Sequence, residues 1–137
     1  MEGAVALQFP KGTLYTIVCK ANEEALRIEN IEKQENSRIT SEVHNPQELT
    51  QLWFIECVNA ASGDFEIVNA LSGYCFDEES GEIHLKRGKL ANDQLFCVEK
   101  APVHAYYTYW WIKTSKNSNK AASLEGLLRY KPFDIND

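Results

Sequence analysis

The chain has 137 residues, which is enough for one domain with one hydrophobic core. Apolar residues make up 44% and charged residues 25%, and this composition excludes a disordered chain. The formal net charge of −6 makes the chain as a whole repel phosphate backbones and anionic lipids, so nucleic acid is not expected as a partner.

The N-terminal stretch MEGAVALQFPKG lacks the features of a signal peptide. Its apolar run is short, no basic segment precedes it, and Pro10 stands where the hydrophobic segment would continue. No run elsewhere approaches the roughly 18 apolar residues of a membrane span. We therefore expect a cytoplasmic protein that does not insert into membranes, with secretion by a non-classical route left open.

The four cysteines, Cys19, Cys57, Cys75 and Cys97, are far apart in the sequence and form no C-x-x-C pair of the kind that binds zinc. Three of them, Cys19, Cys57 and Cys97, lie in apolar runs, where a small buried thiol is the usual role. We expect free thiols in a reducing compartment.

One pattern repeats three times along the chain, over about 12–58, 63–100 and 106–137. Each unit opens with an aromatic residue, one spacer and an isoleucine, which is typical of a half-buried strand. The three openings are Tyr15 with Ile17, Phe65 with Ile67, and Trp110 with Ile112. A polar turn and a second short apolar stretch follow in each unit.

Each unit closes on a Gln-x-aromatic strand. The hexamers QLWFIE at 51–56 and QLFCVE at 94–99 are nearly identical, and a degraded copy ends the third unit. We expect the closing aromatic residues to fill the core, and Gln51 and Gln94 to tie turns together by hydrogen bonds. The closing aromatic residues are Trp53, Phe96 and Phe133.

The repeats predict the fold. Units of about 40 residues made of short strands and turns cannot bury their apolar faces separately and must pack around a common axis. A closed antiparallel barrel capped by three hairpins meets that need. The sequence therefore predicts an all-β protein, a single-domain β-trefoil of three pseudo-symmetric repeats. The helix-friendly stretch 22–36 holds no 3.6-residue period, and 26–31 is predicted as strand and loop.

Unit two contains the pattern I-x-N-x-x-S-G-x-x-[LF]-D, followed by G-x-[IV] and Q-x-[WF]. The matching residues are Ile67, Asn69, Ser72, Gly73, Phe76, Asp77, Gly81, Ile83, Gln94 and Phe96. This pattern resembles the repeat of the ricin B-type (R-type) lectins. The resemblance covers roughly residues 12 to 135 and is strongest over 63–99. It implies a β-trefoil that binds galactose or N-acetylgalactosamine.

The resemblance also implies a sugar pocket in unit two. A carboxylate accepts hydrogen bonds from two vicinal hydroxyls, and the family adds an aromatic ring that covers the apolar face of the sugar. Asp77 falls on the carboxylate position, and Asp93 and Gln94 fall near the amide positions. His84 and Lys86 lie on the strand where the ring is expected, which departs from the family pattern.

Units one and three depart further from this pattern. Arg27 occupies the carboxylate position of unit one, and its strand RITSEV has no ring. Glu125 stands at the carboxylate position of unit three, but only five residues separate it from Lys131. No pocket is assigned to either unit.

The acidic cluster of unit two is a candidate cation site. Carboxylates and a histidine supply suitable ligands, but the cluster lacks the glycine and the alternation of a calcium loop. We predict a solvated acidic turn, with no metal and no cofactor. The cluster consists of Asp77, Glu78, Glu79, Glu82 and His84.

The aromatic stretch from Tyr106 to Trp111 has two interpretations. Its rings either cover the open end of the barrel or form a ligand or dimer contact. Catalysis is not expected, because the sequence has no G-x-S-x-G motif and no phosphate-binding loop.

The sequence thus predicts a non-enzymatic lectin whose partners are glycans or glycoproteins. A single shallow site binds weakly, and several copies raise avidity, so a homodimer is predicted. The alternative is a β-trefoil protein-binding module or protease inhibitor that acts through its loops at 35–51 and 114–121.

Overall fold

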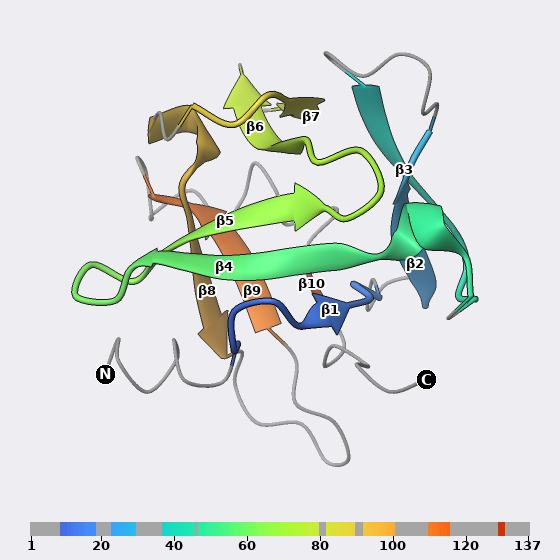
Figure 1. Ribbon diagram of the computed structural model, residues 1–137, viewed down its shortest axis with the longest axis horizontal. Helices are drawn as coiled ribbons and strands as arrows, with labels where there is room; N and C mark the ends of the chain where they lie inside the picture. Colours follow the sequence, from blue (N-terminus) through green and yellow to red (C-terminus); the bar gives the residue numbers. More distant parts are fainter. Residues whose placement is uncertain are drawn as a thin grey trace.

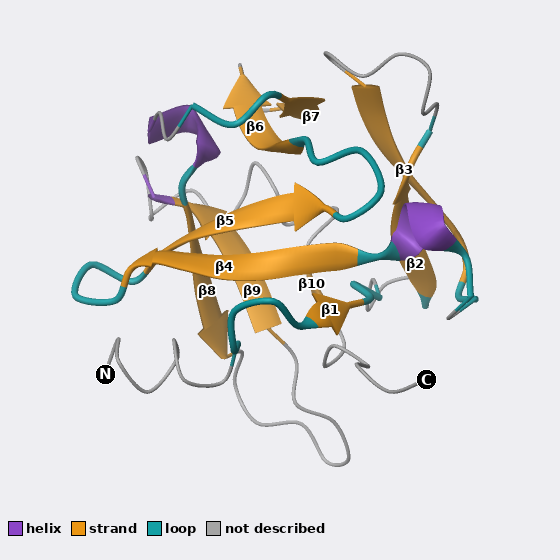
Figure 2. Ribbon diagram, in the orientation of Figure 1, coloured by secondary structure: helices purple, strands orange, loops and turns teal. Residues whose placement is uncertain are grey.

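The computed structural model describes residues 9–18, 23–29, 37–45, 47–79, 82–89, 92–100, 110–115 and 129–130. The described part consists of short strands (Figure 1) and two single-turn 3-10 helices, η1 (Leu49–Gln51) and η2 (Asn92–Gln94), with no α-helix (Figure 2). The strands are β1 (Leu14–Tyr15), β2 (Glu24–Ile28), β3 (Ser37–Val43), β4 (Trp53–Asn59), β5 (Asp64–Asn69), β6 (Cys75–Glu79), β7 (Glu82–Lys86), β8 (Phe96–Lys100), β9 (Trp110–Thr114) and β10 (Arg129–Tyr130). The prediction of an all-β chain is confirmed.

The strands form one curled sheet of antiparallel pairs (Figure 1). Its order is β10-β9-β8-β5-β6-β7-β3-β2, and β4 pairs with both β1 and β5. Strands of different units therefore pair with one another within this sheet. In particular, β3 of unit one pairs with β7 of unit two, where Arg38 lies opposite His84.

The first two units share their local geometry. In each, a 3-10 helix that ends in glutamine precedes the closing strand, β4 or β8. In each, a hairpin precedes that helix, β2–β3 or β6–β7. Arg27 lies opposite Thr40 in the first hairpin, and Asp77 lies opposite His84 in the second. The strand predicted over 26–31 exists, but β2 begins at Glu24 and ends at Ile28.

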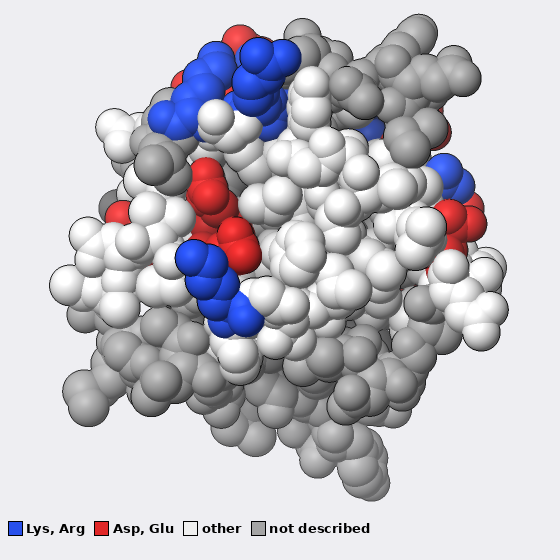
Figure 3. Space-filling view, viewed as in Figure 1, with Lys and Arg blue, Asp and Glu red and all other residues white. Residues whose placement is uncertain are grey.

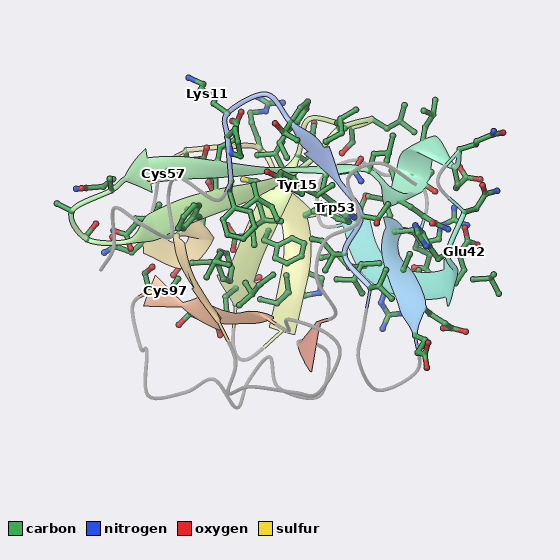
Figure 4. All side chains as sticks on the ribbon, turned by 90° about the horizontal axis from the view of Figure 1, so that it is seen from below. Lys11, Tyr15, Glu42, Trp53, Cys57 and Cys97 are labelled. Carbon is green, nitrogen blue, oxygen red and sulfur yellow. The ribbon has the colours of Figure 1, made fainter. Side chains whose placement is uncertain are left out.

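The core lies inside the curled sheet. Trp53 and Phe96 are fully buried, which confirms their predicted place, while Phe133 lies outside the described residues. The ring of Phe76 packs edge-to-face against both, with centroid distances of 5.2 Å to Trp53 and 5.7 Å to Phe96. The indole Nε1 of Trp53 donates a 3.0 Å hydrogen bond to the carbonyl oxygen of Leu26, so its polar atom is satisfied. Figure 4 shows Trp53 among the strands, with Tyr15 beside it.

The sequence N-A-x-S-G occurs at 59–63 and again at 69–73, and it forms the same turn both times. The backbone N–H of the glycine donates to the carbonyl oxygen of the asparagine, at 2.9 Å for Gly63 and 2.8 Å for Gly73. The asparagine Oδ1 accepts from the serine N–H in both turns. Both glycines have φ above +70°, where a side chain would strain the backbone. The N-x-x-S-G part of the lectin-like pattern therefore specifies a turn.

The cysteines differ from the prediction in their burial. Cys75 is buried, Cys97 is half-buried, and Cys57 is exposed, so the expectation of a buried thiol at 57 was wrong. The reason is local: the β4–β5 register shifts between Cys57 and Asn59, at the end of the pair where the strands leave the core (Figure 4). Among the described residues these three cysteines form no disulfide, and Cys19 lies outside that part of the chain. No helix within the described ranges has the length and apolar character needed to cross a membrane.

Candidate functional site

Asp77 lies on the outer face of the β6–β7 hairpin. Its strand neighbour Phe76 points into the core, and alternation places Asp77 on the other side, directly opposite His84. The side chain is largely covered, with 6% of its surface exposed. Its Oδ2 accepts a 3.0 Å hydrogen bond from the Nε2 of Gln94. The sequence-predicted pair of carboxylate and amide is therefore present.

Gln94 is fully buried and holds three elements together. Besides Asp77, its Nε2 donates to the carbonyl oxygen of Arg87 at 2.9 Å. Its Oε1 accepts from the backbone N–H of Lys89 at 2.8 Å. One side chain thus fixes both the carboxylate and the loop that follows β7, which confirms the predicted tie between turns.

His84 and Lys86 line the same outer face of β7, because the residues that alternate with them, Ile83 and Leu85, face the core. His84 and Lys86 both lie on the strand where a stacking ring was expected. Lys86 is held by an ion pair. Its Nζ lies 3.3 Å from the Oε1 of Glu79, so the charged end is held at the edge of the hairpin. The aliphatic stem of a lysine can cover apolar surface while the ammonium stays in water.

Asp93 is separated from the other predicted residues by its orientation. It is exposed on η2, whereas Gln94, the next residue, is fully buried. The two side chains therefore leave the short helix in different directions. Three of the five predicted residues, Asp77, His84 and Lys86, lie on the β6–β7 hairpin. Gln94 joins them from η2 through its hydrogen bond to Asp77, and Asp93 lies on the solvent side of η2.

Sequence reasoning missed Arg38, which belongs to unit one. It lies on β3 directly opposite His84, which in turn lies opposite Asp77. Directly opposed residues of antiparallel strands share one face of the sheet, so the three form a row across β3, β7 and β6. No signal inside unit two could have revealed this neighbour, because the pairing joins different units.

Unit one contains a similar arrangement, in which a glutamine again binds an acid, but the acid comes from the other strand of the hairpin. The Nε2 of Gln51, also fully buried, donates to the Oε2 of Glu42 and to the carbonyl oxygen of Val43, both at 2.9 Å. Its Oε1 accepts from the N–H of Asn45 at 2.9 Å. The carboxylate comes from β3, on the far side of the molecule from Cys57 (Figure 4).

Arg27, at the position that Asp77 holds in unit two, neutralises this carboxylate. Its Nη1 lies 2.8 Å from the Oε1 of Glu42. The hydrogen bond from Gln51, reinforced by Arg27, holds the pKa of Glu42 below its usual value. The acid of unit one is thus already paired with a cation of its own unit.

The prediction of a solvated acidic turn agrees with Glu79, which is exposed at the end of β6, but was wrong for Asp77 and Glu78. Asp77 and Glu78 are both buried, because they lie in the middle of β6 rather than in the turn after it. Neighbouring residues of a strand point to opposite faces, so their carboxylates do not converge. Within the described ranges no three side chains of His, Cys, Asp or Glu are placed to hold a metal ion. Glu125 and the segment Tyr106–Tyr109 lie outside the described residues.

Comparison by sequence gives no match, either with a family model or with a curated protein. Comparison by structure gives several. The designed three-fold symmetric protein ThreeFoil is similar with a TM-score of 0.61 at 13% identity, over 90% of each chain. The exo-β-1,3-galactanase of Clostridium thermocellum is similar with a TM-score of 0.65 at 17% identity, over 90% of this chain and 28% of that one.

A lectin of Polyporus squamosus, solved with the glycan epitope Neu5Acα2-6Galβ1-4GlcNAc, is similar with a TM-score of 0.58 at 23% identity. The match covers 80% of this chain and 39% of the lectin, so this chain corresponds to well under half of the lectin or of the galactanase. At these identities the likeness concerns the fold. The chain has the β-trefoil fold that its repeats predict.

Proposed function

We propose that the protein is a non-enzymatic carbohydrate-binding protein, a lectin, whose site lies on the outer face of the β6–β7 hairpin. The main support is the carboxylate of Asp77, which the side-chain amide of Gln94 holds in place by a hydrogen bond. An ionised carboxylate has about four acceptor positions, and Gln94 uses one of them. Asp77 shares this face of the hairpin with His84, directly opposite, and with Lys86. A sugar hydroxyl that reaches the remaining acceptor positions can donate a charge-assisted hydrogen bond.

The structural neighbours support the same class of ligand. One is a lectin solved with a glycan, and another is named as a galactanase. We propose galactose or N-acetylgalactosamine as the core sugar, on the strength of the R-type pattern of unit two. His84 lies directly opposite Asp77. Its imidazole would pack against the apolar face of the sugar, as an aromatic ring does in that family.

We further propose that glycans or glycoproteins are the physiological partners, and that the protein works in the cytoplasm. A single shallow polar site gains little free energy after desolvation. A homodimer would present two such sites and raise the avidity for a branched glycan.

A glycan array tests this function with the variant Asp77→Asn. The new side chain keeps an oxygen that can accept from Gln94 but loses the charge, so the fold is expected to persist while binding of galactosides falls at least tenfold. The exposed residue Asp93 provides a matched control, Asp93→Asn. An array on which the unsubstituted protein binds no saccharide would reject the proposal.

A second candidate function is protein binding through the loop that follows β3. Two large apolar side chains are exposed at its ends, Val43 at 78% on β3 and Leu49 at 56% on η1. The side chain of Gln51 holds the backbone of Val43 in place. Rigidly held apolar side chains on a loop are typical of protein-binding surfaces. A blank glycan array, together with inhibition of a cysteine or serine protease that Val43→Ser abolishes, would favour this function over the first.

A further inference from the structure

The row formed by Arg38, His84 and Asp77 combines opposite charges across two units of the fold. Each member lies directly opposite the next. Adjacent strands are about 4.8 Å apart, so the backbones of Arg38 and Asp77 are separated by about 10 Å, with the imidazole between them. This span suits one pyranose ring that carries an exocyclic group.

Arg38 is available at its end of the row. Arg38 is exposed, and within the described ranges its guanidinium makes no hydrogen bond or ion pair. The nearest acidic residue by strand pairing is Glu29, whose backbone N–H donates to the carbonyl oxygen of Arg38 at 3.0 Å. Lys86, by contrast, has its ammonium beside Glu79.

The loop after β7 adds positive charge close to the row. Arg87 and Lys89 are both exposed there, on backbone fixed by Gln94. Figure 3 shows a group of Lys and Arg side chains at the edge of the molecule where β6 and β7 lie in Figure 1. In a chain with a net charge of −6, this edge is a favourable place for an anion.

We infer that the ligand of this site is an anionic saccharide, with hydroxyls on Asp77 and a carboxylate or sulfate group on Arg38. The inference rests on the carbohydrate-binding function proposed above. A guanidinium binds a planar acid group with two parallel hydrogen bonds, which a hydroxyl cannot match. Neither Asp77 alone nor the residues of unit two alone supply this second contact, so the specificity arises where the two units meet.

Titration with three sugars tests the inference, namely methyl β-galactoside, methyl β-galacturonide and the 6-sulfate of methyl β-galactoside. We expect at least one acidic sugar to bind about tenfold more tightly than the neutral one at low salt, and the advantage to shrink as salt is added. The comparison of the two acids identifies which acid group the site prefers. Arg38→Gln should reduce the acidic sugars to the affinity of the neutral one, and Arg38→Lys should retain part of the advantage.

Lys11→Gln is the matched control, because Lys11 is exposed just before β1 and outside the row, and its variant should keep the full preference. Equal binding of all three sugars by the unsubstituted protein would overturn the inference and leave the proposed function standing. Binding of none of them, nor of any other saccharide, would overturn both. A preference for acids that survives in Arg38→Gln would also overturn the inference, since another cation would then hold the acid group.

Discussion

The side-chain amide of Gln94 donates a 3.0 Å hydrogen bond to the carboxylate of Asp77, which lies 17 positions earlier in the chain. The amide is fully buried, and the carboxylate, 6% exposed, lies on the face of its strand that points away from Phe76. A fully buried residue thus sets the position of an acid that is itself largely covered. The same amide holds the loop from Arg87 to Lys89, so one side chain connects the stability of the unit to its candidate site.

Gln94→Ala is expected to destabilise the protein by about 3 kcal/mol. The substitution removes three hydrogen bonds, each worth about 0.5–1.5 kcal/mol, and leaves the buried carboxylate of Asp77 without the amide. Urea-induced unfolding gives the measurement. Asp93→Ala, one residue earlier and exposed, should change the free energy of unfolding by no more than about 0.5 kcal/mol. Similar losses in both variants would contradict the role assigned to the amide.

Phe76→Ala should cost about 3–5 kcal/mol and prevent folding at moderate temperature. The ring is almost fully buried between Trp53 and Phe96, and its removal leaves a cavity that neighbouring rings cannot fill without breaking their contacts. Phe76→Leu keeps most of the apolar volume and should cost less than half as much. Thermal unfolding followed by tryptophan fluorescence compares the two, and equal costs would argue against close packing at this position.

Glu66→Gln should stabilise the protein at neutral pH. Burial raises the pKa of Glu66, and the charge of Glu56, directly opposite on β4, raises the pKa further. Because the folded state holds the proton more tightly than the unfolded state, stability falls as the pH rises through the folded pKa. The penalty is therefore present at pH 7, where removing one of two opposed like charges should gain about 0.5 kcal/mol.

The gain from Glu66→Gln should vanish below about pH 4, where glutamates are protonated in both states. Urea unfolding at several pH values tests this dependence. Glu56→Gln serves as the partner variant, because it removes the repulsion while leaving Glu66 in place. A gain from Glu66→Gln that stayed constant at every pH would show that charge is not its cause.

Glu42 should show the opposite dependence on pH. The hydrogen bond from Gln51 and the neighbouring Arg27 lower the pKa of Glu42, so the folded state favours its ionised form. Its contribution to stability is present above the unfolded pKa and is lost as the pH falls through the folded pKa. Glu42→Gln should therefore destabilise the protein at pH 7 and make little difference in acid. NMR titration of the carboxylate gives a direct check, and a pKa at or above the usual value would contradict the contact.

Much of the fold follows from local patterns in the sequence. The repeated Gln-x-aromatic hexamer predicts both the buried Trp53 and the tie made by Gln51, because each depends on a few neighbouring positions. The N-A-x-S-G turn is local as well. The burial of Asp77 and Glu78 could not be predicted in this way, since an acidic run inside a short strand gives the same letters as an exposed turn. Arg38 is the clearest case, because its place beside His84 depends on how two units pair.

The hairpins of the first two units differ in which strand supplies the acid that the glutamine binds. The glutamine stays in place, while the acid that it binds comes from the first strand of one hairpin, at Asp77, and from the second strand of the other, at Glu42. Exchanging the acid between strands leaves the supporting amide in place, so the charge of one hairpin can change while its fold stays the same. In a trefoil built in this way, each unit can change its charge without a change in the others.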